Sequence, residues 1–340
     1  MKNGLMLVGT EKSLNIGDYI QAIAAEQFFK HIDVYIERER LDEYNGEPVK
    51  MIMNGWYMHD PKHWPPSSQI IPLFVAFHVN SLVRNNFLSP ESLDYLKRYQ
   101  PIGCRDVDTV ELLQNKGLNA YFSGCLTLTL GYKYHSKEKN NKCYFVDPFY
   151  ILHHNQIKIV FQNIVELVFY YRKIRIISRK MKQIRKFKDL LALVSFYREY
   201  KKIFGEELLL NAEYIRHEDL DFHKLYPTDI SKLDYAKGLV NKYSQAALVV
   251  TSRIHCALPC LGIGTPVIYV ENKQQVEASS CRLNGLREFF NIVEWDKDHL
   301  VKKFSFDGLI TAKSHPQNKK NYLEYATALI ERCDLFCKND

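Results

Sequence analysis

The residues best placed to carry out chemistry form one short motif, Ser252-Arg253-Ile254-His255. Arginine offers a permanent positive charge and a planar fork of N–H donors, and histidine changes its charge near neutral pH. An apolar run precedes the motif, and a short helical stretch leads from it to a second apolar run. This order predicts a βαβ unit of a parallel sheet, with the motif at the carboxyl edge where ligands bind. The motif therefore indicates an anion site with a proton-transfer residue beside it.

Two interpretations of this motif stay open on the sequence alone. Alternation at the strand end would point Arg253 and His255 the same way, and the amides of the following helix would add positive potential. Alternatively, Arg253 pairs with an acid of the core and His255 is satisfied within a helical turn.

A second motif, Asn15-Ile16-Gly17-Asp18, places a carboxylate directly after a glycine turn. Asp18 could accept a proton or hold a sugar hydroxyl. It could equally cap the helix predicted from Tyr19 to Lys30, because aspartate is a strong N-cap residue. The two roles are compatible.

A third motif, Cys104-Arg105-Asp106-Val107-Asp108-Thr109, again sets an arginine where a strand gives way to a helix. Arg105 could therefore reach an anion at the edge of its sheet. The alternative is an ion pair of Arg105 with Asp106 or Asp108 that only fixes the turn.

Aromatic and histidine residues follow the third predicted strand. Trp56 and Tyr57 could stack on sugar rings, or they could plug the space beneath the proline-rich loop that comes next. His59 and His63 are four residues apart, but Pro61 breaks the helix that a two-histidine metal site would need. We therefore expect no metal site. The chain also lacks a glycine-rich phosphate loop and a serine nucleophile elbow.

The elements that must position these motifs alternate between strand and helix along most of the chain. Such alternation predicts an α/β fold with parallel, doubly wound sheets. At 340 residues the chain is longer than a single core usually supports, so we expect two domains. The first is predicted at residues 1–140 and the second at 141–317, with a helical insertion at about 151–204. An amphipathic helix at 318–340 closes the chain.

The amino-acid composition limits the kinds of protein to which this chain can belong. Hydrophobic residues make up 46% of the chain, which is enough for packed cores and argues against disorder. The start of the chain lacks a signal-peptide pattern, and no apolar run approaches the roughly 18 residues that span a bilayer. The eight cysteines are expected to be reduced core thiols rather than a disulfide framework. These features predict a cytoplasmic protein.

The net charge of +7 is concentrated in residues 151–204, which hold thirteen lysines and arginines against three acids. We predict two helices there. Their basic, aromatic surface could contact an anionic membrane, bind nucleic acid or simply face solvent. No recognised nucleic-acid-binding fold accompanies the charge, so we expect no nucleic-acid partner. The predicted membrane-contact residues are Arg179, Lys180, Lys182, Arg185, Lys186 and Lys188.

Taken together, the three motifs resemble the polysaccharide pyruvyl transferase family. The resemblance rests on their order and spacing over most of the chain, and most specifically on the Arg-x-His motif followed by Gly264-Thr265-Pro266-Val267-Ile268. It implies two Rossmann-like domains that face a cleft, similar to glycosyltransferases of the two-domain B type (GT-B). The basic insertion at 151–204 is a departure from the core pattern of the family, and it leaves the acceptor open.

The resemblance also implies an activity. Such enzymes transfer a pyruvyl group from phosphoenolpyruvate onto sugar hydroxyls, as a ketal, and the acceptor is expected to be a cell-surface or capsular polysaccharide precursor, with a lipid-linked form as one option. No metal, nucleotide or other cofactor is required. The expected catalytic residues are His255, Arg253 and Asp18. The expected donor-binding residues are Arg253, Arg105, Ser252 and Arg282, and the expected acceptor-binding residues are Asn15, Asp18, Trp56 and Tyr57.

Two other functions fit the same sequence. One is a glycosyltransferase that uses a sugar nucleotide on the same two-domain fold. The other is a non-catalytic protein that keeps the fold and docks at the inner face of the cytoplasmic membrane or on a partner.

Overall fold

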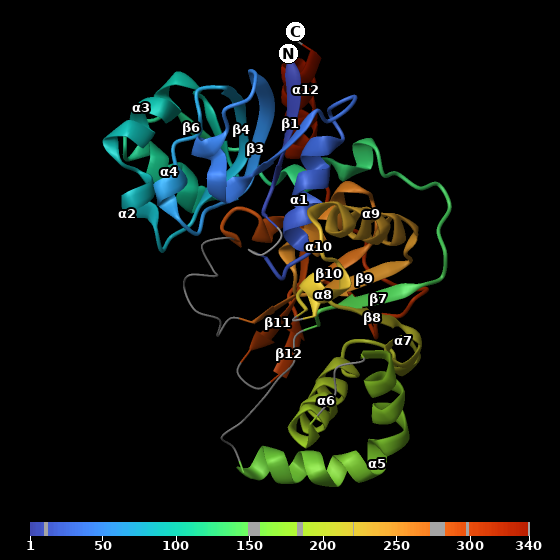
Figure 1. Ribbon diagram of the computed structural model, residues 1–340. Coiled ribbons are helices and arrows are strands. Elements are labelled where there is room, and N and C mark those ends of the chain that lie inside the picture. The colour runs from blue at the N-terminus through green and yellow to red at the C-terminus, as the bar shows by residue number, and fades with distance from the viewer. Residues whose placement is uncertain are drawn as a thin grey trace.

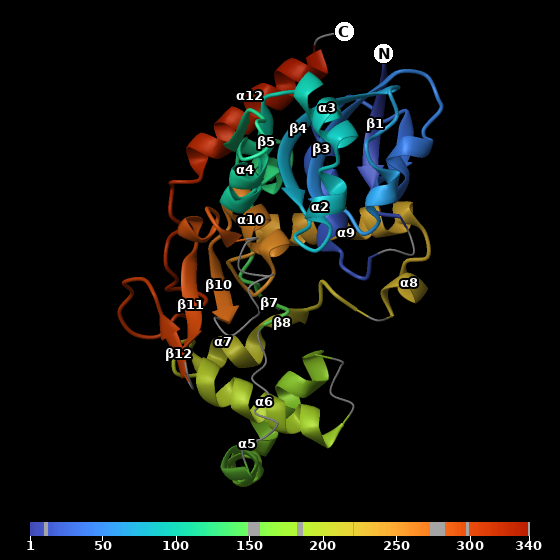
Figure 2. The same cartoon turned by 90° about the vertical axis from the view of Figure 1, so that its left-hand side faces the viewer.

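The structure is a computed structural model, which describes residues 1–9, 13–148, 157–181, 186–219, 221–272, 283–296 and 299–338. It is an α/β fold built on two largely parallel six-stranded sheets. In both views of Figures 1 and 2 one sheet with its helices lies above the other. The α/β class expected from the sequence is confirmed.

The first sheet has the strand order β2-β1-β3-β4-β5-β6, and all its described pairings are parallel. Its central strands β3 and β4 are mostly apolar and almost entirely buried because helices cover both faces. The strands are β1 (Lys2–Leu7), β2 (Val34–Glu37), β3 (Val49–Tyr57), β4 (Ile70–Val79), β5 (Ile102–Cys104) and β6 (Ala120–Phe122). The helices of this half are α1 (Gly17–Glu26), η1 (Arg38–Glu43), η2 (Pro61–His63), α2 (Arg84–Phe87), α3 (Pro90–Arg98), α4 (Val107–Gln114) and η3 (Leu126–Tyr132).

The second sheet has the order β12-β11-β10-β9-β7-β8, and only β12 runs antiparallel to its neighbour. Its strands are β7 (Cys143–Val146), β8 (Glu213–Ile215), β9 (Leu248–Thr251), β10 (Val267–Asn272), β11 (Asn291–Asp296) and β12 (His299–Lys302). Its helices are α5 (Ile157–Met181), α6 (Phe187–Tyr200), α7 (Glu206–Asn211), α8 (Phe222–Leu225), α9 (Asp229–Gln245), α10 (Ile254–Gly262) and η5 (Arg287–Phe289), and α12 (Leu323–Lys338) follows it.

The predicted strands agree with eleven of these twelve to within a few residues; β12 was not anticipated. The helix expected after Cys281 begins outside the described residues, and the described part of that region contains only the short η5. The two helices predicted in the basic segment are α5 and α6, and both are present. None of the helices formed by the described residues has the length and apolarity needed to cross a bilayer.

One hydrophobic core runs through the contact between the two halves. It contains Tyr19 and Ile20 of α1, Leu128 of η3, and Leu258 and Leu261 of α10. The backbones of η3 and α10 approach so closely that a Cβ added to the glycine at position 262 would lie 2.4 Å from the carbonyl oxygen of Leu128. Helix α12 then packs back on η3 and β4, so the last helix of the chain covers the first sheet. The packing fixes how the edges of the two sheets meet.

The cysteines behave as the composition predicted. The seven described cysteines are all free, and all but Cys337 are buried. Cys256 and Cys260 lie one turn apart on α10 inside the shared core. They therefore contribute to packing as small apolar side chains.

Candidate active site

The strand order places one topological switch point in each sheet. In the first sheet β1 lies between β2 and β3, so the chain leaves it first on one side and then on the other. In the second sheet β7 lies in the same way between β8 and β9. Ligands of doubly wound folds bind outside the carboxyl ends of the strands at such points. All three sequence motifs lie near these two edges.

Arg253 lies at the switch point of the second sheet, directly after β9. Its Nε donates to Asp147 Oδ2 at 2.9 Å, and its second guanidinium nitrogen lies 2.8 Å from Glu218 Oε2. Ser252 Oγ donates to the carbonyl oxygen of Asp147 at 2.6 Å, and the Arg253 amide donates to Thr251 Oγ1. The arginine is thus paired with two carboxylates, which matches the second of the two interpretations of this motif.

His255 does not point the same way as Arg253. Strand β9 ends at Thr251 and α10 begins at Ile254, so Arg253 is the N-cap residue of a helix and His255 belongs to its first turn. The alternation expected from an extended strand is therefore wrong here. His255 faces the other half of the molecule, where its Nε2 lies 3.4 Å from a guanidinium nitrogen of Arg105.

Arg105 is the most unusual charge of the site. It follows β5, its exposed fraction is only 2%, and the same guanidinium nitrogen donates to Gln21 Oε1 at 3.3 Å. Its Nε is buried with no hydrogen-bond partner. Among the residues that the structure describes, no carboxylate forms an ion pair with it. A buried charge without a counterion is costly, so this position is suited to receive an anion.

The neighbouring acid, Asp106, forms no direct ion pair with Arg105. Asp106 turns toward His78, whose Nδ1 lies 2.5 Å from Oδ2, and its Oδ1 accepts from the amide and hydroxyl of Thr109. Burial alone would raise the pKa of Asp106, but the hydrogen bond and charge of His78 and the charge of Arg105 hold it below its usual value. Asp106 is thus the N-cap of α4, and Asp108 accepts from Asn284, so the alternative ion pair of Arg105 with one of these acids is wrong.

Asp18 is connected to Arg105 through one glutamine. Gln21 Nε2 donates to Asp18 Oδ1 at 3.3 Å, and Oε1 of the same amide accepts from Arg105. The second Asp18 oxygen accepts from Ser13 Oγ at 2.6 Å. Asp18 does not cap α1, because it is the second residue of the helix and the N-cap position is Ile16. The expected capping role is therefore wrong, and the carboxylate faces a pocket instead.

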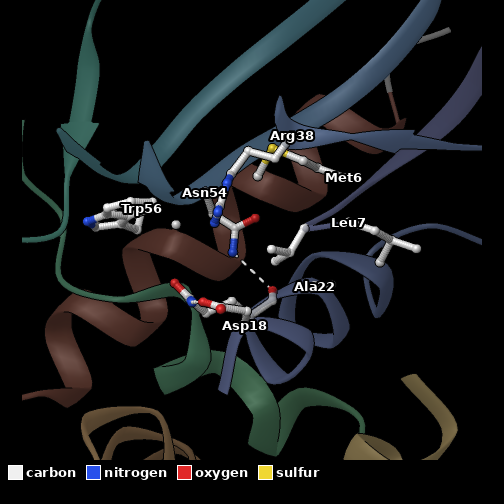
Figure 3. A pocket seen from close by; sticks show the side chains of 10 residues that line it. Met6, Leu7, Asp18, Ala22, Arg38, Asn54 and Trp56 are labelled. Carbon is white, nitrogen blue, oxygen red and sulfur yellow. Dashed lines mark hydrogen bonds between the residues drawn. The ribbon is translucent and has the colours of Figure 1, made fainter. Parts of the chain in front are cut away.

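This pocket lies at the switch point of the first sheet (Figure 3). Asp18 faces the side chains of Arg38 and Asn54 across it, with Trp56 beside them. The Arg38 guanidinium carbon lies 5.1 Å from the Trp56 ring centroid, and its Nε pairs with Glu39. The lining residues are Met6, Leu7, Val8, Asp18, Gln21, Ala22, Arg38, Asn54, Gly55 and Trp56. A carboxylate, an amide and an aromatic ring are the groups that suit a sugar.

Tyr57 does not line this pocket. Its side chain is fully buried among Trp64, Phe77 and Phe87, and its hydroxyl donates to the sulfur of Met6. The aromatic pair is therefore divided, with Trp56 at the pocket and Tyr57 in the core.

The loop before α1 joins the two halves at the site. The Ile16 amide donates to the carbonyl oxygen of His217, and Asn15 forms a β-bridge with Glu218. Asn15 Oδ1 accepts from the Gly17 amide, so its side chain holds the turn. A Cβ at position 17 would lie 3.0 Å from the Cβ of His255, which explains why glycine occupies that position.

The remaining predicted site residues fall into three groups. Arg282, Lys182 and Arg185 lie outside the described residues. Lys180 donates to the carbonyl oxygens of Leu210 and Ala212, so its charge is used within the protein. Arg179, Lys186 and Lys188 are exposed.

Sequence reasoning missed four residues of the site: Gln21, Arg38, Asp147 and Glu218. Asp147 carries the clearest signal, because it directly follows a predicted strand, and it adopts a left-handed φ of 40°. The other three carry no local pattern that marks them. Their roles depend on which segments of the chain meet.

Among the residues that the structure describes, one cluster of side chains could hold a metal ion. Asp42, Glu43 and His63 lie close together, with His63 Nδ1 2.9 Å from Asp42 Oδ1. The two acids are exposed and lie outside the pocket lining. We assign no role to this cluster.

Comparison with known proteins matches the chain to a protein family. The family model described as polysaccharide pyruvyl transferase matches residues 15–274, which include all three motifs. No curated protein and no solved structure matches the chain.

Proposed function

Since the chain belongs to the polysaccharide pyruvyl transferase family, we propose that it transfers a pyruvyl group from phosphoenolpyruvate to the hydroxyls of a sugar. The donor would bind at Arg105 and His255, with Arg253 reaching it from the N-terminus of α10, and the acceptor would bind in the pocket at the switch point of the first sheet. A GT-B-like cleft between the halves is part of this proposal.

The single observation that carries the proposal is the buried, uncompensated guanidinium of Arg105. Phosphoenolpyruvate carries a carboxylate and a phosphate, and arginine binds both through paired N–H donors. An anion at Arg105 would satisfy the orphaned Nε and neutralise the charge at once. A neutral donor could accept from Nε but would leave the charge in place.

Arg253 would supply the second contact to the donor. Its partner Asp147 is mostly buried, whereas the Glu218 side chain is 50% exposed. We propose that the donor displaces Glu218 and leaves Asp147 in place, because a half-exposed carboxylate can return to water at little cost. Asp147 and Ser252 would then act as positioning residues that hold the loop of Arg253.

His255 would move the proton. A guanidinium N–H can only donate, so its contact with Nε2 favours a neutral imidazole with a lone pair on that nitrogen. Such a ring can take the proton of the attacking sugar hydroxyl and pass it to the methylene carbon of the donor. Asp18 would orient the hydroxyl from the pocket side.

The steps balance without a cofactor. The first hydroxyl oxygen bonds to the central carbon of phosphoenolpyruvate as the methylene carbon gains a proton and becomes a methyl group. The bond between this central carbon and the phosphate oxygen then breaks. The second hydroxyl attacks the same carbon, its proton leaves with inorganic phosphate, and a cyclic ketal results.

The acceptor is proposed to be a precursor of a cell-surface or capsular polysaccharide. Asp18, Asn54 and Trp56 would contact the sugar, with Asn15 holding the turn that presents Asp18. A lipid-linked precursor would place the enzyme in the cytoplasm, at the inner face of the membrane.

The test begins with the donor. We expect phosphoenolpyruvate to raise the melting temperature of the protein and a sugar nucleotide to leave it unchanged. The protein should then release phosphate from phosphoenolpyruvate in the presence of a suitable glycan, and the glycan should gain the mass of a pyruvyl ketal. Release of a nucleotide from a sugar nucleotide would instead identify a glycosyltransferase. Stabilisation by neither donor would favour a binding protein.

A further inference from the structure

Helix α5 exposes an apolar surface that the chemistry of the cleft does not use. The exposed fractions of Phe161, Val168 and Phe169 are 68%, 76% and 79%. The full set of exposed apolar side chains on the helix is Phe161, Ile164, Val165, Val168, Phe169, Tyr171 and Ile176. We call this set, together with Arg172, Arg175 and Arg179, the outer face of α5. Contiguous exposed apolar residues of this kind mark an interaction site.

The outer face is also positively charged. At 3.6 residues per turn, Arg172, Arg175 and Arg179 continue the row that begins with Phe161, Val165 and Val168. All three arginines are exposed. The one acid of the helix, Glu166, lies on another side and pairs with Arg198 of α6 at 2.8 Å. The face therefore combines apolar insertion groups with unopposed positive charge.

The opposite side of α5 anchors the helix to the protein. Ile174 and Ile177 are fully buried in the core of the second half, and Asn163 and Ser195 of α6 exchange hydrogen bonds. The outer face thus belongs to an ordered, packed helix.

The position of α5 suits docking on a flat surface. In Figures 1 and 2 it forms the end of the molecule farthest from the first sheet. The first part of the helix runs across the foot of the molecule in Figure 1 and is seen end-on in Figure 2, and the second part turns up toward α7 and β8. A plane could therefore contact the first part of the helix without meeting the rest of the protein.

We propose that the outer face of α5 docks the protein on an anionic lipid bilayer, with the first part of the helix lying in the plane of the interface. Phe161, Val168 and Phe169 enter the boundary between headgroups and acyl chains, and the arginines bind lipid phosphates. A bilayer supplies the negative charge that this face needs. A second copy of the same face would oppose arginines with arginines and offers no acid.

The sequence predicted membrane contact through the basic residues from Arg179 to Lys188. The proposed contact is instead the outer face of α5, which shares only Arg179 with that set. The ammonium group of Lys180 already donates to backbone carbonyl oxygens. The outer face of α5 also carries exposed apolar side chains, which a count of charged residues in the sequence does not reveal. The docking rests on α5 alone and does not depend on the chemistry of the cleft.

The experiment measures flotation of the full-length protein with two kinds of vesicle, phosphatidylcholine alone and phosphatidylcholine mixed with phosphatidylglycerol. We expect binding to the mixed vesicles only, and its loss in high salt. Arg172→Glu, Arg175→Glu and Arg179→Glu together should weaken binding by at least roughly a hundredfold. Phe161→Ser, Val168→Ser and Phe169→Ser together should weaken it by about tenfold or more.

Matched controls carry the same changes on other exposed surfaces. Leu82→Ser, Leu225→Ser and Leu335→Ser remove side chains with exposed fractions of 84%, 61% and 63%. Lys116→Glu, Lys242→Glu and Lys320→Glu change the charge equally at exposed positions outside α5. Both control triples should retain vesicle binding.

Three outcomes would overturn the proposal. The first is equal binding to both kinds of vesicle, and the second is equal loss in the control and α5 variants. The third is a self-associated protein, measured by light scattering, that the serine triple converts to a monomer without lipid ever binding. Phosphate release measured with a soluble acceptor separates this proposal from the enzymatic one, because vesicle binding without turnover would refute only the activity.

Discussion

Two arginines stand at corresponding places in the two halves of the molecule, and their surroundings differ. Arg253 follows a strand of the second sheet and is held by Asp147 and Glu218. Arg105 follows a strand of the first sheet, is 2% exposed and forms no described ion pair. Both look equivalent in the sequence, since each lies between a strand and a helix.

This difference indicates which of the two arginines is the main contact for an anionic ligand. A paired arginine stabilises a fold, whereas a buried arginine without an anion costs stability and persists only where something else requires it. We therefore assign the primary anion contact to Arg105 and a secondary, exchangeable contact to Arg253. Five variants can sharpen or break this comparison.

Replacing Arg105 should have the largest effect. Arg105→Met should lower kcat/KM for phosphoenolpyruvate on the order of a thousandfold, because it removes the charge that faces the donor. The melting temperature should stay the same or rise, because an uncompensated buried charge is lost. Phosphate release and thermal denaturation measure the two effects, and Arg98→Met, at an exposed position, is the control. Unfolding of Arg105→Met at ordinary temperature would make Arg105 a structural residue.

Replacing His255 should come next. His255→Asn should lower kcat by roughly a hundredfold or more, since the proton must then move through water. The dissociation constant for phosphoenolpyruvate, measured by calorimetry, should change far less than kcat. His31→Asn, an exposed histidine of the first half, should leave both unchanged. Full turnover in His255→Asn would transfer the proton-moving role to another residue.

Variants of Arg253 and of its partner Glu218 should have smaller effects, and these effects on KM should have opposite signs. Arg253→Lys should raise KM for the donor by roughly tenfold. A lysine ammonium group, unlike the planar guanidinium group, cannot hydrogen-bond Asp147 and the donor at the same time in the same geometry. Glu218→Gln should lower KM, because it removes the carboxylate that competes with the donor. Steady-state kinetics measure both. An increase in KM with Glu218→Gln would show that Glu218 helps to bind the donor.

The smallest effect concerns stability and pH. The pKa of Asp106 is lowered in the folded protein, so its carboxylate stabilises the fold above the unfolded value of 3.8 and loses that contribution as the pH falls through the folded value. Asp106→Asn should therefore reduce the free energy of unfolding by about 1 kcal/mol at neutral pH. The difference from the unaltered protein should shrink below the unfolded value. Denaturant titrations across this range measure it, and a constant difference would exclude linkage to Asp106.

Much of the fold was predictable from the sequence because its strands are apolar runs between turn residues. The βαβ unit around Arg253 illustrates this, since β9, α10 and β10 all lie where the pattern placed them. Strand β12 was missed because it is a short antiparallel strand at the edge of its sheet, with alternating exposure and no continuous apolar run.

The sequence by itself determined the elements, their order and the three motifs at strand ends, because these depend on local periodicity and on turn residues. The tertiary structure decided how each charge is compensated. Asp106 is adjacent to Arg105 in the chain but turns to His78, whereas Asp147 lies 106 positions before Arg253 and reaches it across the sheet. The same holds for Gln21, which joins Asp18 to Arg105. Electrostatic pairing depends on distance in space, and only the packing of α1, η3, α9 and α10 sets those distances.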